Sequence, residues 1–288
     1  MKHNLHSTFY SYAKVNLYLG ITGKDEKDGY HFIDSLFQEV TLYDVIDIWQ
    51  SPNDSVRFIN EKIPQENTVA RALQMFKESF SICDSFTIEV FKNIPIGSGL
   101  GGGSSNAAYV LLALANFYSV PEEKILEIGK KIGSDVPFFL YGGLCHVQGK
   151  GEIVTPLKAR LKDIYFLIIY PEIPISTKWA YSLIKDYDSK SNENFNNIPV
   201  IDIDFLKKIM YNKFQLFVFE NCKELVEVKN NLESFLDSHL SFMSGSGSSF
   251  VYVYTEEQKA KRDFERIKQN FTYKVFFCEP YYRRTGER

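Results

Sequence analysis

The sequence predicts an α+β protein of two domains, and three observations favour this fold class. The chain has 288 residues, which is long for one hydrophobic core and sufficient for two. Segments with the alternation of strands occur beside segments with helical periodicity. The sequence changes from glycine-rich to polar at Ile153–Lys162, just before a new apolar strand at Ile164–Tyr170. We therefore predict domains at 1–156 and 157–288.

The expected elements follow from periodicity and from helix or turn signals along the chain. Strands are predicted at Ser7–Gly20, as a pair within Phe37–Trp49, and at Thr87–Phe91, Ile164–Tyr170 and Tyr273–Cys278. Helices are predicted at Asn67–Phe80 (capped by Asn67 or Thr68), Ala107–Phe117, Glu122–Ile132, Gln215–Leu240 and Glu256–Gln269. Hairpins are expected at Gly23–Ser35 and Gly143–Glu152, and a mobile surface loop at Asp186–Asp204.

Composition and charge restrict the possible partners. Hydrophobic residues make up 44% and charged residues 24%, which is ordinary for a globular protein, and the formal charge of −3 attracts neither nucleic acid nor an anionic membrane. The cysteines are far apart and form no C-x-x-C pair, which argues against a zinc site and for reduced thiols. The N-terminal segment lacks the apolar region of a signal peptide, and the longest apolar run is too short to span a bilayer. We expect a cytoplasmic protein, a monomer or weak homodimer, without nucleic-acid or membrane partners.

The most informative segment runs from Asn93 to Tyr118, between an apolar strand and an Ala/Leu-rich helix. Its glycines are Gly97, Gly99, Gly101, Gly102 and Gly103, and the residues at the expected N-cap are Ser104, Ser105 and Asn106. Glycines permit positive φ, so successive N–H groups can point at one ligand, and the helix N-terminus adds donors and a positive dipole end. The segment therefore predicts a polyphosphate site.

Other interpretations of these glycines fit less well. Gly97, Gly99 and Gly102 satisfy the dinucleotide pattern G-x-G-x-x-G, but the acidic residue expected about 20 positions later would fall at the helix start Glu122–Glu123 instead of after a strand. A Walker A loop is excluded because the chain contains no G-K-[ST]. A simple tight turn needs only one or two glycines.

Several polar residues each have a structural and a functional interpretation. Lys14 and Asn16 lie on the same face of a strand, where a lysine is usually solvated. Asp135, between Ser134 and Val136-Pro137 and before two phenylalanines, is either an N-cap or a positioned base. Tyr30 and His31 either pack at a strand start or offer a ring face and ring nitrogens to a base.

Several separated segments resemble one family. PIGSGLGGGSSNAA (95–108) resembles the phosphate loop of the GHMP kinases. AKVNLYL (13–19), DGYH followed by S-x-F (28–37), GSDVPFF (133–139) and P-x-x-x-x-S-T-x-x-x-Y (171–181) resemble the branch of these kinases that acts on a cytidine diphosphate-linked methylerythritol. The small-residue loop and strand at Phe242–Tyr254 resembles the third motif of the family, and the resemblance is weakest in the C-terminal half.

This resemblance implies a fold, cofactors and a set of site residues. The fold would be that of a GHMP kinase, with an N-terminal ribosomal-protein-S5-domain-2-like domain and a C-terminal ferredoxin-like domain. Asp135 would be the catalytic base and Lys14 its catalytic partner. ATP would bind with Mg²⁺ held mainly by phosphates and water, since Asn106 stands where many relatives have aspartate and no acidic metal ligand is apparent.

The resemblance also assigns the binding residues. Those implied for the nucleotide are Asn67, Lys92, Pro95, Gly97, Gly99, Leu100, Gly101, Gly102, Gly103, Ser104 and Ser105. Those implied for the phosphate acceptor are Asn16, Tyr30, His31, Lys150, Thr177 and Tyr181, with Tyr30 and His31 holding the cytosine. From its residue type alone, Lys92 is equally a solvated lysine, and Asn67 is equally a cap.

The expected activity is ATP-dependent phosphorylation of the 2-hydroxyl of the methylerythritol part, in the non-mevalonate isoprenoid pathway. A homoserine-type or mevalonate-type GHMP kinase is an alternative, but those substrates have no base for Tyr30 and His31. A non-catalytic nucleotide sensor is a second alternative, but it would need neither Lys14 nor Asp135.

Overall fold

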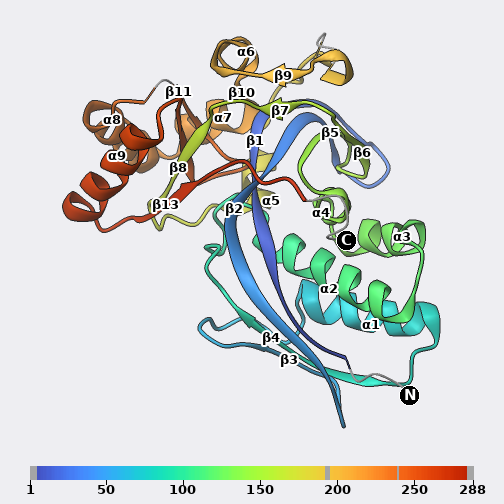
Figure 1. Cartoon of the computed structure of the whole chain (residues 1–288). Helices are drawn as coiled ribbons and strands as arrows, with labels where there is room; N and C mark the ends of the chain where they lie inside the picture. The colour runs from blue at the N-terminus through green and yellow to red at the C-terminus, as the bar shows by residue number, and fades with distance from the viewer. Residues whose placement is uncertain (1–4, 192–194, 239, 284–288) are drawn as a thin grey trace.

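The computed structural model describes residues 5–191, 195–238 and 240–283, and it has a mixed α/β fold (Figure 1). The largest sheet is built on a long antiparallel hairpin of β1 (His6–Lys24) and β2 (His31–Ser51). Its strand order is β10-β1-β2-β4-β3, and β5 and β6 extend from β2 beyond that path. The other strands are β3 (Ser55–Phe58), β4 (Ser85–Phe91), β5 (Leu144–Gly149), β6 (Ile153–Pro156) and β10 (Tyr211–Asn212).

The prediction of two strands within Phe37–Trp49 is wrong, because β2 is one continuous strand. β2 pairs with β1 along most of its length, and register shifts such as that between Tyr12 and Ala13 take up the twist without a turn. The charged residue in the middle, Asp44, is fully buried and bonded within the fold, so it does not end the strand.

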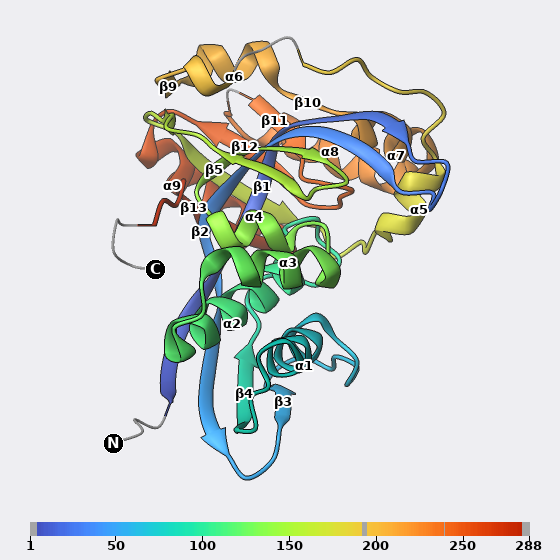
Figure 2. The same cartoon turned by 90° about the vertical axis from the view of Figure 1, so that its right-hand side faces the viewer.

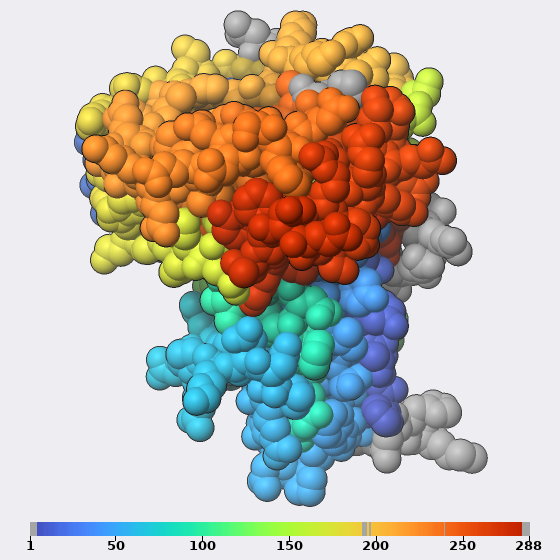
Figure 3. All heavy atoms as spheres, turned by 90° about the vertical axis from the view of Figure 1, so that its left-hand side faces the viewer, coloured from blue at the N-terminus to red at the C-terminus, as the bar shows by residue number. Residues whose placement is uncertain are grey.

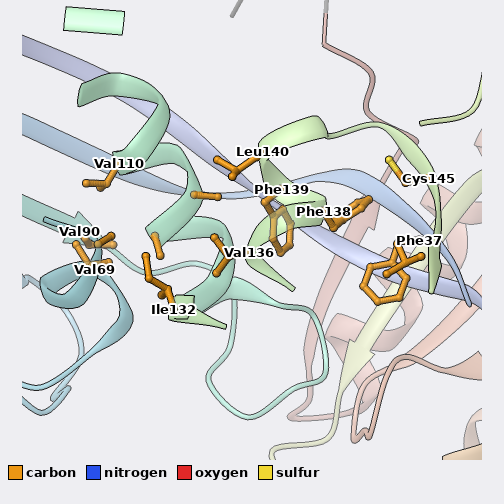
Figure 4. Close-up of a cluster of buried hydrophobic side chains, with 14 of the residues drawn as sticks. Phe37, Val69, Val90, Val110, Ile132, Val136, Phe138, Phe139, Leu140 and Cys145 are labelled. Carbon is orange, nitrogen blue, oxygen red and sulfur yellow. The ribbon is translucent and has the colours of Figure 1, made fainter. Parts of the chain in front are cut away.

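Helices cover one face of this sheet (Figure 2). They are α1 (Thr68–Phe80), α2 (Gly102–Tyr118), α3 (Glu122–Ile132) and α4 (Val136–Tyr141). The side chain of Asn67 caps α1 by accepting the N–H groups of Val69 and Ala70, both at 3.0 Å. Apolar side chains of α2, α3 and α4 meet in the core, where Val110, Ile132 and Phe139 belong to one hydrophobic cluster (Figure 4).

Helix α2 begins earlier than the sequence predicted. Gly101, with φ +74°, occupies the N-cap position, and the helix starts at Gly102. Ser104, Ser105 and Asn106 therefore lie in the first turn and not at the cap. The physical reason is that the positive φ of Gly101 already turns the chain into the helix, so no side-chain cap is needed.

The C-terminal half contains a second, antiparallel sheet with the order β11-β12-β8-β13. Its strands are β8 (Tyr165–Tyr170), β11 (Leu240–Met243), β12 (Phe250–Tyr254) and β13 (Lys274–Cys278). The helices of this half are α5 (Thr177–Ser182), α6 (Ile203–Ile209), α7 (Lys213–Asn221), α8 (Lys223–Phe235) and α9 (Glu257–Asn270).

Two expectations for this half differ from the structure. The helix predicted over Gln215–Leu240 is two helices, because Cys222 between α7 and α8 has non-helical angles of φ −134° and ψ 84°, and β11 starts at Leu240; residue 239 lies outside the described residues. The predicted loop 186–204 contains a 3₁₀ turn, Phe195–Asn197, and the strand β9 (Val200–Ile201), which pairs with β7 (Arg160–Leu161). Residues 192–194 of this segment lie outside the described residues, and its mobility stays a prediction.

The two halves pack directly on each other (Figure 3). One hydrophobic cluster contains both Ile46 of the first sheet and Tyr252 of the second, and β10 from the C-terminal half pairs with β1. Within the described ranges, we find no helix with the length and apolar character that a bilayer crossing requires.

Candidate active site

A cavity of about 570 Å³ lies where the glycine loop meets β1, α4 and α5. Both halves of the chain line it: Lys14 and Asp135 come from the first, and Thr177 and Ser246 from the second. It brings together most of the site residues predicted from the sequence. These are Lys14, Asn16, Asn67, Lys92, Pro95, Gly97, Gly99, Leu100, Gly101, Gly102, Gly103, Ser104, Asp135, Thr177 and Tyr181.

Lys14 is held rigidly on β1 and faces a carboxylate. Its ammonium donates to Asn16 Oδ1 at 2.7 Å and to the carbonyl of Gly99 at 3.0 Å, and it lies 3.7 Å from Asp135 Oδ2. Burial lowers the pKa of Lys14, while the negative charge of Asp135 opposes this shift. Lys14 is buried, so the interpretation of this residue as a solvated strand lysine is wrong, and its catalytic role stays a prediction.

Asp135 stands immediately before α4, at the N-cap position. In the described structure its side chain makes no capping hydrogen bond to the helix, and the side chain is 30% exposed toward the cavity. Its carboxylate is therefore not used to cap α4. It remains available to a group bound in the cavity, beside the Lys14 ammonium.

Gly99 and Gly101 give the loop a shape that other residues cannot adopt. Gly99 has φ +79°, and a Cβ there would lie 2.1 Å from the carbonyl oxygen of Ser244, in the loop between β11 and β12. Gly101 has φ +74°, and a Cβ there would lie 2.9 Å from the ring of Phe139 on α4. The glycine loop is thus packed between the two halves of the molecule.

A buried polar network lies beneath the loop. Asp44 on β2 accepts the N–H groups of Asn93 at 2.7 Å and Ile94 at 2.8 Å, and it forms an ion pair with Lys92. Lys92 also donates to Asn106 at 3.1 Å, and burial lowers its pKa. The interpretation of Lys92 as a solvated lysine is therefore wrong. Its ammonium sits directly under α2, since a Cβ on Gly102 would lie 3.0 Å from it.

Two other polar residues of the first turn of α2 are engaged in the fold. Ser105 is buried, is absent from the described cavity lining, and donates its hydroxyl to the carbonyl of Tyr12 at 2.6 Å. Asn106 donates to Ser11 Oγ at 2.7 Å and Asp44 Oδ2 at 2.8 Å. Of the two predicted serines, only Ser104 faces the cavity.

Three residues predicted for the acceptor lie outside the cavity lining. Tyr30 is 59% exposed at the hairpin turn. Lys150 is bound to Asp25 at 2.7 Å and Asp28 at 2.6 Å, so it fastens the β1–β2 turn. His31 stacks on Tyr181, with ring centroids 4.7 Å apart and planes 15° apart, and burial lowers its pKa. Tyr181 lines the cavity, so His31 contacts the cavity wall through this stack.

The cavity also contains residues outside the predicted set. Ser246 binds Thr177, with 3.1 Å between the hydroxyl oxygens, and Gly245 lies beside the Lys14 ammonium. The small-residue sequence of 244–249 was the available signal for these two. Lys62 and Phe214 also line the cavity and carry no such signal, because a lone lysine in a polar loop and an aromatic residue in a helix are common. Among the described residues, no cluster of three His, Cys, Asp or Glu side chains is arranged to hold a metal ion.

The comparisons with known proteins agree with this geometry. Residues 67–143, which include the glycine loop and Asp135, match the model of the GHMP kinases N terminal domain. The site and the fold thus define a GHMP kinase, as the sequence predicted.

The relatives identify the family more closely. The 4-diphosphocytidyl-2-C-methyl-D-erythritol kinase of Thermotoga petrophila is 37% identical over 85% of this chain and 90% of its own length. The enzyme of the same name from Clostridium botulinum is 32% identical over 91% of this chain and 95% of its own. A crystal structure of 4-(cytidine 5'-diphospho)-2C-methyl-D-erythritol kinase aligns with a TM-score of 0.79 and 27% identity, covering 96% of this chain and all of that one. The chain belongs to the 4-diphosphocytidyl-2-C-methyl-D-erythritol kinase family, and the predicted family is confirmed.

We predict that Gly99→Ala disrupts the site far more than Gly97→Ala. Both glycines have positive φ, so each substitution carries a backbone penalty of about 1–2 kcal/mol. Only the Cβ at 99 collides with backbone, because the nearest atom to a Cβ at 97 is 3.7 Å away. Nucleotide affinity, measured by titration calorimetry, should fall at least about tenfold more in Gly99→Ala, which corresponds to about 1.4 kcal/mol. Equal affinities in the two variants would contradict the packing described here.

Proposed function

We propose that the protein transfers the γ-phosphate of ATP to the 2-hydroxyl of 4-diphosphocytidyl-2-C-methyl-D-erythritol. The observation that carries the proposal is the pair of Lys14 and Asp135, with 3.7 Å between ammonium and carboxylate, in one cavity with the glycine loop. The names of the relatives supply the acceptor. In this proposal the enzyme belongs to the non-mevalonate route to isoprenoid precursors.

Asp135 acts late in the proposed reaction. An alcohol is about as weak an acid as water, with a pKa near ~15.7, and an ordinary aspartate has a pKa near ~3.9. The difference of about 12 units corresponds to roughly 16 kcal/mol, which is too much for full deprotonation before attack. Asp135 therefore orients the hydroxyl and receives its proton as the new phosphorus–oxygen bond forms, as expected for a loose phosphoryl transfer.

Lys14 supplies the positive charge of the site. Its buried ammonium lies 3.7 Å from the Asp135 carboxylate and interacts strongly with negative charge that develops on a transferring phosphoryl group. Asn16 and the carbonyl of Gly99 fix its direction, so little reorganisation is needed when the reaction occurs.

The glycine loop and the start of α2 fit a nucleotide polyphosphate. Gly101, Gly102 and Gly103 line the cavity at the start of α2, where the first backbone N–H groups of a helix have no partner within it, and Ser104 adds a hydroxyl. The ammonium of Lys92 lies beneath this turn, where its ion pair with Asp44 and its hydrogen bond to Asn106 fix the position of the turn. Mg²⁺, if bound, would be held mainly by phosphates and water, and it would neutralise charge on the phosphates.

The acceptor would bind between α5 and the β1–β2 hairpin. Tyr181 and Thr177 offer an aromatic ring and a hydroxyl at the cavity, and His31, stacked on Tyr181, adds its ring nitrogens. Tyr30, exposed at the same turn, is free to pack on a pyrimidine ring. Lys150 would act indirectly, through the turn that it fastens to Asp25 and Asp28.

We also propose which known domain fold each half of the chain adopts. The order of elements β8, helices, β11, β12, α9 and β13, with the sheet order β11-β12-β8-β13, supports a ferredoxin-like domain in 157–288. Residues 1–156 would then be the ribosomal-protein-S5-domain-2-like domain. We further propose a cytoplasmic location and a monomer or weak homodimer, consistent with free cysteines at the described positions.

The function is tested by ATP consumption of the purified protein with three acceptors in parallel. Diphosphocytidyl methylerythritol should be turned over, and mevalonate and homoserine should not. Turnover with another acceptor would reject the substrate and keep the reaction class. Tight ATP binding without turnover of any acceptor would favour a nucleotide sensor.

We predict that Asp135→Asn lowers kcat at least about 100-fold while nucleotide affinity stays within about twofold. The amide keeps the shape of the side chain but receives no proton. Steady-state kinetics and nucleotide titration check this. Near-normal turnover would remove Asp135 as the base.

We predict that His31→Ala raises KM for the cytidine substrate at least about tenfold, a loss of about 1.4 kcal/mol, and leaves KM for ATP almost unchanged. His31→Phe is the matched control, because it keeps the stack on Tyr181 and removes the ring nitrogens. Recovery by phenylalanine would show that His31 acts by packing alone. Equal losses for both ligands would show a structural role for the whole hairpin.

A further inference from the structure

The last described residues of the chain cross the N-terminal half along β2. Thr41 donates its N–H to the carbonyl of Glu279 at 3.0 Å, and Tyr281 donates its N–H to the carbonyl of Glu39 at 2.8 Å. The ring of Tyr281 stacks on Tyr12, with centroids 3.7 Å apart. The segment 279–283 is therefore fastened to the first sheet, although it follows the last strand of the second.

This segment ends in a guanidinium group at the C-terminal end of α4. Arg283 Nη1 donates to the carbonyl of Leu140 at 3.2 Å, and Nη2 donates to the carbonyl of Phe139. Nη2 also forms an ion pair with Glu39 Oε1 at 3.1 Å. The side chain of Arg283 is 11% exposed and that of Glu39 is fully buried, so water screens this pair only weakly.

Glu39 binds the chain just after α4, at Gly143. Its Oε2 accepts the N–H of Gly143 at 2.8 Å, and its backbone N–H donates to the carbonyl of Gly143 at 2.8 Å. A Cβ on Gly142 would lie 2.6 Å from both Arg283 Nε and Glu39 Oε2, so the side-chain pair closes tightly over the chain there. Arg283 and Glu39 together clamp residues 139–143.

Helix α4 depends on such a clamp because it has only six residues. A helix this short has little stability of its own, and its last carbonyl groups have no partner within the helix. Asp135 stands at its start, and Phe139 packs on Gly101 of the glycine loop. In Figure 4, Phe138, Phe139 and Leu140 of α4 lie between Phe37 and Val110. A displacement of α4 would therefore move both the carboxylate and the loop.

We propose that Arg283 is a positioning residue for the reaction: it holds α4 by its C-terminal carbonyl groups and so sets the position of Asp135 relative to Lys14. The inference rests on the proposed function, in which Asp135 is the base. A misplacement of about 1 Å in a reacting group can lower the rate about 100-fold, so a clamp remote from the cavity can control kcat.

The simplest variant also changes stability. Arg283→Met removes the guanidinium and leaves the Glu39 charge buried without its ion-pair partner, which is destabilising in itself. The double variant Glu39→Gln/Arg283→Met removes both charges, while the glutamine oxygen can still accept the N–H of Gly143. It separates the two effects, because the carbonyls of Phe139 and Leu140 remain without the guanidinium.

We expect the double variant to melt near the wild-type temperature and to have a kcat at least about tenfold below wild type, with both KM values within about twofold. Arg266→Met is the control, because Arg266 pairs with the buried carboxylate of Asp263 at 2.8 Å in the second half, and it should leave kcat unchanged. Rates are divided by the concentration of nucleotide-binding sites, so unfolded protein does not count. A double variant with wild-type kcat would overturn the proposal.

The variant Arg283→Lys and amide hydrogen exchange, which needs no substrate, give two further tests. Lysine keeps the charge beside Glu39 but has one nitrogen in place of the fork, so kcat should fall at least about threefold at an unchanged melting temperature. Amide hydrogen exchange at 136–143 should be faster in both variants, and unchanged exchange would overturn the clamp. If the wild-type protein turned over none of the acceptors, the proposed function would fail, and the exchange rates would still decide whether Arg283 holds α4.

Discussion

The buried carboxylate of Asp44 is the constraint on which the nucleotide side of the structure depends. A charge without solvent is unfavourable unless it is paired and hydrogen-bonded, and Asp44 meets this condition through Lys92, Asn106 and two backbone N–H groups. Those two N–H groups belong to Asn93 and Ile94, where the chain leaves β4 for the glycine loop. These hydrogen bonds therefore stabilise the buried charge of Asp44 on β2 and also fix the point at which the glycine loop begins.

The other end of the loop is fixed by contacts that involve both halves of the molecule. Gly99 packs on the carbonyl of Ser244 in the second half, and its own carbonyl accepts the Lys14 ammonium. Gly101 packs on Phe139 of α4. The loop is thus a shared boundary of β1, α4 and the second sheet, and the ion pair of Lys14 and Asp135 forms where these meet. This explains how Lys14 and Asp135, which are far apart in the sequence, come to lie with 3.7 Å between ammonium and carboxylate.

The sequence was most informative where one local rule determines one feature. The glycine run predicted the loop, and the alternation of strands placed Lys14 and Asn16 on one face, where the structure joins them at 2.7 Å. The sequence was less informative where long-range pairing decides. Ser105 has the residue type of a phosphate ligand but donates to Tyr12, and Lys92 resembles a surface lysine but is buried against Asp44. The continuity of β2 through Asp44 likewise depends on partners distant in the sequence.

The position of the C-terminal segment 279–283 also depends on pairing between residues distant in the sequence. Nothing local in Tyr281 or Arg283 predicts that they lie on β2, because each is an ordinary surface residue by type. Their position follows from β13, which directs the chain back across β2 through the bridge between Val40 and Pro280. The segment that follows β13, the edge strand of the second sheet, thereby contacts both β2 and the end of α4. An arginine has the right chemistry for this place, since its fork can bind two carbonyl groups and a carboxylate at once and it keeps its charge when buried.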